Sequence, residues 1–580
     1  MKYILIFSAL LLTSVCAAES DWNPRAAYLK QLVDSVPGFL SIQNKDSGRF
    51  GKEPWITEDQ NVIFQLAAAW SIQDTANPYY HDQAVLEAIM KGGDALVDSQ
   101  DKDGNWTFRK KDNSTWGQTL EPWAFNRWMR AYHIIQSAMP AERRATWEKA
   151  MLVSLKRLES VMRSGRVHNK TTYHAATMYC AGLCFQREDW KQAAHDFMAK
   201  VVAEQSLGGW WSEHSGPVVG YNRVYVEGLG LYYALSHDAG VLEALRRGAL
   251  YHATLTYPNG SSVETVDERN PFHEGVDRGK VGFSFTPEGR GYLLRQSEPP
   301  GKWSVSTDDA AAHLLYGETG AAKPTAADGD ENLTVLGNNE ALVLRKKPWF
   351  ICLSAFTCEQ STSRWIQDRQ NFMSIFHDRA GLIIGGGNTK LQPLWSNFTI
   401  GNTGLLKHQP GDEKPEFVAK RGLIHLPTKA ALRADQTAPG IDLAYGTEQC
   451  RLTAQPLDDT RLKLICESTV NTPLPVEGHI VFLPHVKASL KTAAGKSATL
   501  GEKVIEWSSR DVGGWFECHG VRVGVPPGST LRWPARAHNP YKKDGRSTLE
   551  EARLVLCVPF TKEANKREIT VEILSSSKPE

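Results

Sequence analysis

The chain has 580 residues, and its 66 Lys and Arg nearly balance 65 Asp and Glu, which gives a formal net charge of +1 at pH 7. This balance excludes a global field that attracts nucleic acid or an anionic membrane, so affinity for a polyanion requires a local group of cations. The length exceeds what one hydrophobic core usually supports and indicates two to four domains.

Residues 1–18 have the pattern of a secretory signal peptide. Lys2 gives the positive start, residues 4–12 are apolar, and small residues stand at positions 17 and 18. The pattern predicts a secreted or periplasmic protein, with a lipoprotein anchored at Cys16 as the alternative. No other stretch approaches the roughly 20 apolar residues of a membrane span. Eight further cysteines in this length are too sparse for a disulfide-built scaffold.

Residues 19–319 are predicted to form an α/α toroid, because two kinds of helical segment alternate there. Four segments are rich in aromatic and small residues, which is typical of buried helices: 61–72, 120–135, 171–185 and 221–235. Four others carry charges on one face only: 81–99, 141–162, 189–205 and 240–256. The alternation predicts an inner ring inside an outer ring, an incomplete barrel of helix pairs. An irregular helical domain or an open solenoid is the alternative.

Residues 331–580 are predicted to form an antiparallel β-sandwich, so the class is multidomain, α then β. Short runs of β-branched and aromatic residues alternate with Gly, Pro, Asn and Asp turns. The expected strands include residues 341–344, 349–356, 372–376, 461–465, 479–483 and 554–560. Residues 320–330, rich in Ala, Gly, Lys and Asp, are the expected linker.

The segment over residues 208–229 carries the best candidates for chemistry. Tyr221 and Tyr225 fall on one helical stripe, and His214 stands in a loop with Gly and Pro just before that helix. The loop allows His214 to lie beside the first turn of the helix. Tyrosines at this spacing are also common in a helix core, which is the alternative.

This segment resembles the active-site segment of toroid-type polysaccharide lyases, the group of chondroitin, hyaluronate and toroidal alginate lyases. In that group a histidine or arginine is followed by a tyrosine that starts an inner helix, then by an acidic residue before Gly-Leu. His214, Tyr221 and residues 227–229 have that order, and Asn169 stands at the asparagine position of the preceding inner helix. Lys170 follows Asn169 where several of these lyases have a histidine, so the partner of Asn169 is left open.

The resemblance implies β-elimination on a uronic-acid polysaccharide, an anionic substrate. Asn169 is expected to neutralise the uronate carboxylate, because charge develops there when the C5 proton leaves. Tyr221 is the expected acid for the leaving O4. Whether Tyr221 or His214 is the base depends on whether the C5 proton and O4 leave from the same side. The chain has no His-Glu-x-x-His or paired Cys-x-x-Cys motif, so neither a metal nor a cofactor is predicted.

Further residues are expected to bind the substrate. Trp116 and Gln118 are expected to open an inner helix and to contact sugar rings. Trp211, beside the site, is also expected to contact sugar rings. The full set of expected substrate-binding residues is His174, Arg223, Gln118, Trp116, Trp211 and Arg278. Residues 267–273 form a polar segment, interpreted either as a loop over the site or as an ordinary interdomain turn.

Mannuronate or glucuronate polymers, alginate or glucuronan, are the preferred substrates, because the neutral chain shows no surplus of cations for sulfate groups. The alternatives are a lyase of glycosaminoglycans such as hyaluronan, chondroitin or heparin, and a non-catalytic glycan-binding protein. A toroid glycoside hydrolase acting on uronides is also open. It requires two facing carboxylates, for which Glu121, Glu213, Glu227 and Asp267 are available.

Overall fold

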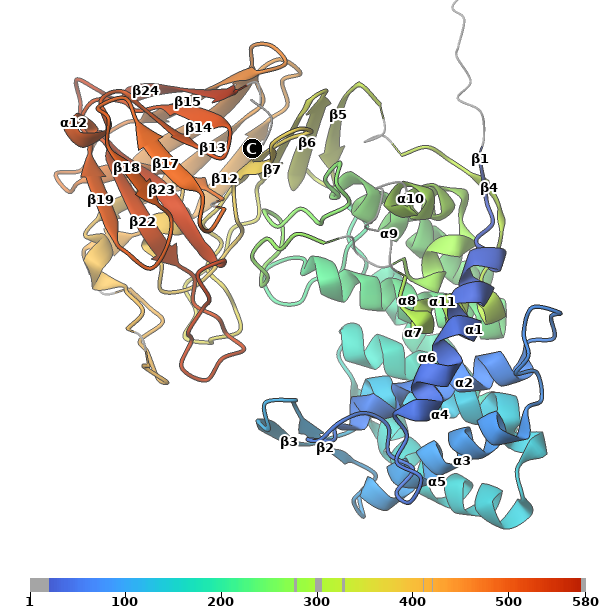
Figure 1. Ribbon diagram of the computed structural model, residues 1–580. Coiled ribbons are helices and arrows are strands. Elements are labelled where there is room, and N and C mark those ends of the chain that lie inside the picture. The colour runs from blue at the N-terminus through green and yellow to red at the C-terminus, as the bar shows by residue number, and fades with distance from the viewer. Residues whose placement is uncertain are drawn as a thin grey trace, which may run out of the picture.

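The structure of the protein is a computed structural model. It describes residues 20–275, 279–297, 305–325, 329–409, 411–419, 421–483 and 485–574. The predicted signal peptide with Cys16, and Arg278, lie outside these residues. Figure 1 shows a domain of helices, blue to green, followed along the chain by a domain of strands, yellow to red.

The helical domain contains a closed inner ring. Each of its six elements packs against the next, and the last returns to the first. A short 3-10 helix and one further helix complete the ring. Its elements are α2 (Val62–Ser71), α4 (Pro122–Ile135), α6 (Asn169–Cys184), α8 (Val219–Ser236), η4 (Val281–Phe285) and α11 (Thr307–Tyr316).

The outer helices cover this ring with one buried face and one charged face. Helix α3 packs on α2, α5 and α7 pack on α6, and α9 packs on α8. This arrangement confirms the predicted alternation. The outer elements are α1 (Arg25–Ser41), α3 (Gln83–Ser99), α5 (Ala141–Ser164), α7 (Glu188–Ala203), α9 (Leu242–Thr254) and α10 (Pro287–Ser297). Short 3-10 turns occur at η1 (Thr57–Asn61), η2 (Gln136–Ala138) and η3 (Ala239–Val241).

The prediction that Trp116 and Gln118 open an inner helix is wrong. Both residues lie in β3 (Thr115–Thr119), which pairs with β2 (Trp106–Arg109) in a hairpin. Helix α4 begins only at Pro122, because proline favours the first helical position and Glu121 caps the helix by accepting from the Trp123 N–H. In Figure 1 this hairpin projects from the helical domain on the side of the strand domain.

The strand domain consists of two antiparallel sheets packed face to face. Alternate residues of each strand, such as Leu462 and Leu464 of β15, enter a shared core. The first sheet contains β5 (Glu331–Leu336), β6 (Ala341–Lys346), β7 (Trp349–Ser354), β8 (Met373–His377), β9 (Gly381–Ile384), β10 (Phe398–Gly401), β11 (Leu423–Ile424), β16 (Val476–Phe482), β19 (Ile505–Ser508), β22 (Thr530–Arg536) and β23 (Ala552–Phe560).

The second sheet is built in the same way, and all six strands expected from the sequence are present in the two sheets. It contains β12 (Lys429–Arg433), β13 (Gly440–Tyr445), β14 (Glu448–Pro456), β15 (Arg461–Ser468), β17 (Ser489–Thr492), β18 (Ser497–Thr499), β20 (Trp515–Cys518), β21 (Val521–Gly524) and β24 (Lys566–Ile573). Short helical turns in this domain are η6 (Pro393–Trp395), η7 (Thr403–Leu405) and α12 (Ser509–Val512). The linker region contains β4 (Gly320–Ala322), which pairs with β1 (Ser20–Trp22).

The two domains share a hydrophobic cluster. Tyr257, from the helical domain, stacks on Phe376 of β8 with the ring centroids 5.0 Å apart. Arg369 of the strand domain, 1% exposed, donates to the carbonyl oxygens of Val266 and Pro217 at 3.0 and 3.3 Å. The sandwich therefore fixes two loops of the helical domain, one before α8 and one after α9.

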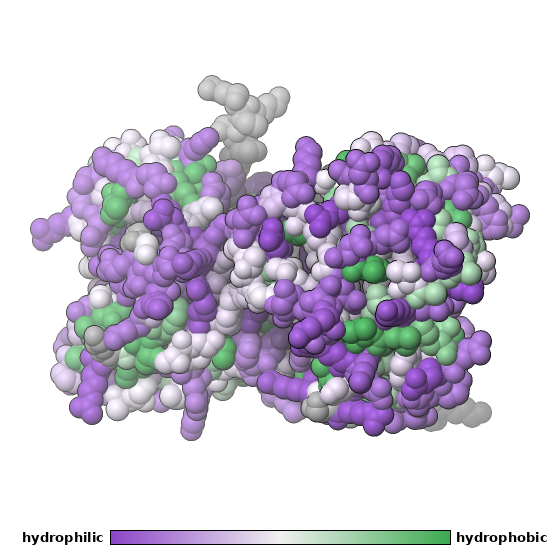
Figure 2. Space-filling view, turned by 90° about the horizontal axis from the view of Figure 1, so that it is seen from below, coloured by the Kyte–Doolittle hydropathy of each residue, from purple (hydrophilic) through white to green (hydrophobic). Residues whose placement is uncertain are grey.

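The surface is mostly polar. Figure 2 shows one face of the molecule as largely hydrophilic, with hydrophobic residues in separate patches. Among the described residues, no helix combines the length and the apolar character that crossing a membrane requires. The eight described cysteines are all free thiols.

Candidate functional site

Tyr221 lies in the first turn of α8, and its hydroxyl group faces the strand domain. Arg269 Nη1 donates to the Tyr221 hydroxyl oxygen at 2.7 Å, and the Tyr541 hydroxyl lies 3.4 Å from it. Arg269 is only 9% exposed and also donates from Nε to the carbonyl of Trp365 at 3.2 Å. A guanidinium at this distance stabilises negative charge on the phenol oxygen.

His214 lies in the loop before α8 and is held by a buried carboxylate. Its Nδ1 is 2.7 Å from Glu268 Oε1, and the side chains are 33% and 0% exposed, respectively. Glu268 Oε2 accepts from the Ser215 N–H at 2.7 Å and lies 4.0 Å from Arg369. Because a carboxylate accepts, Nδ1 carries the proton, and Nε2 of the neutral ring is left with a lone pair.

The consecutive residues Glu268 and Arg269 thus position His214 and Tyr221. The residue just before them, Asp267, fixes their backbone. Asp267, 4% exposed, accepts from the N–H groups of Arg269 and Asn270, both at 2.7 Å. Its other oxygen accepts from the Val219 N–H at 2.7 Å, which supplies the cap that the N-terminus of α8 lacks in its own sequence. Residues 267–270 are therefore a fixed support under the site.

Asn169 is the first residue of α6, which packs beside α8. Arg166, just before α6, donates to the carbonyl of Glu213 at 3.1 Å and so joins the head of α6 to the His214 loop. Asn169 is 7% exposed, and its Oδ1 accepts from the Lys170 N–H at 2.6 Å. The cap of α6 is His168, whose side chain accepts from the Lys170 N–H, so the helix-capping role considered for Asn169 is wrong. The amide nitrogen of Asn169 is the group left for a ligand.

Three residues expected to bind the substrate lie elsewhere. His174 is 5% exposed, and burial lowers its pKa to about 3, so it is a neutral core residue. Trp211 is 1% exposed, stacks on Tyr225 at 4.9 Å and offers no free ring face. Arg223 is 9% exposed and donates to Ser262, away from Tyr221. Helical spacing could not predict that these three side chains are buried, because tertiary contacts decide which polar side chains are covered.

An aromatic and cationic group lies between the hairpin and the strand domain, formed by Lys110 and Trp116 of the hairpin and by Trp365 and Tyr541 of the strand domain. Trp116 is 49% exposed, and its ring lies 4.7 Å from that of Trp365 in the strand domain. Lys110 Nζ lies 4.7 Å from the Trp116 ring and 5.6 Å from the Tyr541 ring. Since Tyr541 also contacts Tyr221, this group leads away from the candidate site. Gln118 is exposed and donates to Thr107 within the hairpin.

The carboxylates considered for a hydrolase have structural partners. Asp267 caps α8, and Glu227 lies 3.2 Å from Lys280 Nζ and accepts from Tyr173 at 3.2 Å. Burial raises the pKa of Glu121 and of Glu213 to about 7, and Glu121 caps the N-terminus of α4. Among the described residues, none of these contacts places two of the four carboxylates against each other.

Glu268 and Arg269 are the functional candidates that the sequence did not single out. Both lie in the polar segment over residues 267–273, for which a role at the site and an ordinary turn were equally open. The available signal was the run Asp-Glu-Arg-Asn over residues 267–270. Three buried charged residues in a row need partners, and here the partners are the site residues.

No family model matches the chain, and no curated protein matches it by sequence. Solved structures do match. Chondroitin AC lyase of Streptomyces coelicolor A3 in complex with chondroitin sulphate has 13% identity and a TM-score of 0.54, over 96% of this chain and 81% of that chain. Heparinase III has 12% identity and a TM-score of 0.52, over 93% and 81%. A mutant heparan sulfate lyase of Pedobacter heparinus has 10% and 0.50, over 95% and 84%. At these identities the likeness shows the fold, and it confirms the predicted toroid followed by a sandwich.

Proposed function

We propose that the protein is a polysaccharide lyase that cleaves a uronic-acid polysaccharide by β-elimination, with a glycosaminoglycan as the substrate. One observation carries the proposal. A phenol paired with a guanidinium and an imidazole paired with a carboxylate are held by two consecutive residues, Arg269 and Glu268, at 2.7 Å each. A base, an acid and a cation are the groups that proton abstraction beside a carboxylate needs.

Each group has a defined task in this proposal. The amide nitrogen of Asn169 donates to the uronate carboxylate and stabilises the charge that develops as the C5 proton leaves. Arg269 stabilises the Tyr221 oxygen when that oxygen gives up its proton. Glu268 keeps the proton of His214 on Nδ1, so that Nε2 accepts hydrogen bonds or a proton.

Substrate stereochemistry selects the base. Where the C5 proton and O4 leave from the same side, as in glucuronate, the deprotonated oxygen of Tyr221 takes the C5 proton and then gives that proton to O4. Where they leave from opposite sides, as in iduronate, Nε2 of His214 takes the C5 proton and the Tyr221 hydroxyl protonates O4. Both routes conserve protons, and both end with a C4–C5 double bond in the new chain end.

A glycosaminoglycan replaces alginate and glucuronan as the preferred substrate. The three structural neighbours described above are named for chondroitin and for heparan sulfate or heparin. Cations from both domains also lie against the Trp365 ring, with Arg364 and Arg269 each about 6 Å from it, and Arg269 contacts Tyr221 as well. Such a local group favours a polyanion, which the neutral total charge of the chain could not indicate.

An ultraviolet assay tests the proposal, because the C4–C5 double bond is conjugated with the carboxylate and absorbs. The protein is incubated with chondroitin sulfate, hyaluronan, heparan sulfate, alginate and glucuronan. Absorbance is expected to rise with a glycosaminoglycan, and Tyr221→Phe is expected to abolish the rise. Tyr233→Phe is the matched control, because Tyr233 lies on the same helix, partly buried, against Phe285. Chain cleavage without absorbance would assign a hydrolase, and binding without cleavage would assign a glycan-binding protein.

A further inference from the structure

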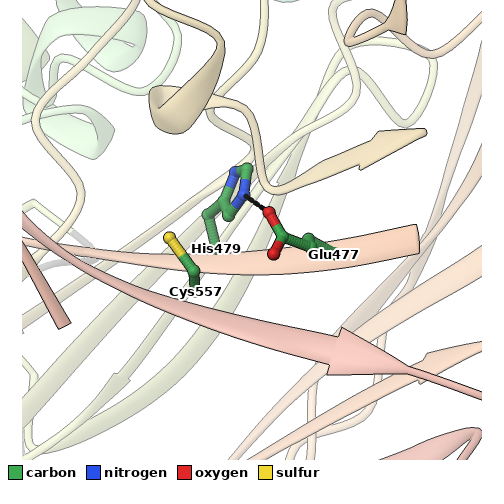
Figure 3. A group of neighbouring side chains, drawn as sticks. All are labelled: Glu477, His479 and Cys557. Carbon is green, nitrogen blue, oxygen red and sulfur yellow. Dashed lines mark ion pairs between the residues drawn. The ribbon is translucent and has the colours of Figure 1, made fainter. Parts of the chain in front are cut away.

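A group of three potential metal ligands lies in the sandwich, far along the chain from the candidate site. Glu477 and His479 stand two residues apart on β16, and Cys557 pairs directly with His479 from the neighbouring strand β23. Figure 3 shows the three side chains on the same side of these two strands. One carboxylate oxygen, one imidazole nitrogen and the thiol sulfur all lie within 4.8 Å of one another.

The orientation of His479 prepares it to bind a metal. Its Nδ1 is 2.8 Å from the carbonyl oxygen of Ser396, which can only accept, so Nδ1 carries a proton. In the neutral ring, Nε2 then has a free lone pair. His479 is 0% exposed, and Nε2 has no hydrogen-bond partner among the described residues. It lies 3.6 Å from Glu477 Oε2. Figure 3 marks this contact as an ion pair. A buried nitrogen that makes no hydrogen bond is costly unless a ligand satisfies it.

The distances and charges suit zinc. Bond lengths of about 2.0–2.2 Å give a tetrahedral site edges of about 3.3–3.6 Å between nitrogen and oxygen ligands, close to the 3.6 Å observed here. A divalent ion with one thiolate and one carboxylate is neutral, which burial favours. The nearby cation Arg532 is paired with Glu506 at 3.3 Å. The Glu477 side chain is 32% exposed, so water can reach the fourth position.

A second acidic group in the protein shows the contrasting case. Glu227, Asp308 and Asp309 also lie within ligand distance of one another. There, however, Lys280 Nζ lies 3.2 Å from Glu227 and 3.0 Å from Asp309, and Arg127 pairs with Asp308. Side-chain cations occupy the place of a metal in that group. The group on β16 and β23 has no such cation between its ligand atoms in the described part of the chain.

We propose that Glu477, His479 and Cys557 bind one zinc ion, with water as the fourth ligand, and that this ion ties β16 to β23. Binding releases the proton of the Cys557 thiol to solvent, because the thiolate is the ligand. The proposal does not depend on the proposed lyase function, and its readouts are metal content, spectrum and thermal stability.

The full chain is stripped with a chelator, and Zn²⁺ alone is added back. The expected results are one zinc per chain, a higher Tm with zinc, and, when Co²⁺ replaces zinc, a thiolate-to-cobalt absorption band with the intensity of a tetrahedral site. Glu477→Ala is expected to weaken zinc binding by at least about tenfold, and Cys557→Ala to remove the cobalt–thiolate band.

Cys352→Ala is the matched control, because Cys352 is another buried thiol of the same sheet, on β7. It is expected to keep both the zinc and the band. Less than stoichiometric zinc in the wild-type chain, or a cobalt spectrum that Cys557→Ala leaves unchanged, would overturn the proposal. The wild-type spectrum decides the question even if a variant fails to fold.

Discussion

Replacing Arg269 by alanine removes a cation that contacts the Tyr221 oxygen at 2.7 Å. In the proposed reaction this oxygen carries negative charge during proton transfer, and the guanidinium is its fixed donor. Loss of one such donor lowers kcat by about 10²- to 10³-fold, or about 2.7–4 kcal/mol. The lost hydrogen bond to the Trp365 carbonyl costs about 1 kcal/mol of stability, so the fold is expected to persist.

The rate of absorbance increase on the preferred glycosaminoglycan gives kcat and KM for the wild type, Arg269→Ala and Arg269→Lys. The lysine variant keeps the charge but not the planar fork, so its kcat is expected to fall between the other two. Arg246→Ala is the control, because Arg246 pairs with Glu243 and Glu288 and contacts neither Tyr221 nor His214 among the described residues. A kcat of Arg269→Ala within threefold of the wild type would refute the role of Arg269 at the phenol oxygen.

Three further changes test neighbouring parts of the site. Glu268→Gln is expected to lower kcat by about 10²- to 10⁴-fold on an iduronate polymer, where His214 is the base, and by less than tenfold on a glucuronate polymer; equal losses would contradict the two routes. Trp116→Ala is expected to raise KM about three- to tenfold with kcat unchanged, since Trp116 only stacks; an unchanged KM would remove it from the binding surface. Burial, and then the charge of Glu58, raises the pKa of Glu121 to about 7, so this group stabilises the fold below about pH 4.5 and loses that contribution as the pH rises through 7. In urea unfolding, the free energy of unfolding of Glu121→Gln relative to that of the wild type is therefore expected to rise by up to about 3 kcal/mol between pH 5 and pH 8. A difference that does not change with pH would exclude this cause.

The local charge of the site explains why the proposed substrate class differs from the one preferred from composition. Equal numbers of acids and bases say nothing about where each lies, and the preference for unsulfated polymers rested on that total. In the fold, Lys110 of the hairpin and Arg364 of the strand domain lie against the same group of aromatic rings. They come from positions more than 250 residues apart, so no window of the sequence contains both.

The sequence by itself determined the architecture. A helix buried on all sides differs in composition from a helix buried on a single face, which predicts the helical domain. Strands alternate with turn residues, which predicts the strand domain. It also determined the order of Asn169, His214 and Tyr221, because each stands at the start of an inner helix or in the loop before one. Helix starts have local signals in proline, glycine and capping residues.

Only the tertiary structure decided which polar side chains serve the site. His174 and Trp211 have the residue types of a sugar site but are covered by neighbouring helices, while Glu268 and Arg269 reach His214 and Tyr221 across about 50 residues of chain. In the same way, strand register alone sets Cys557 beside His479. Burial and hydrogen bonding depend on partners distant in sequence, and periodicity reports only which face of a segment is apolar.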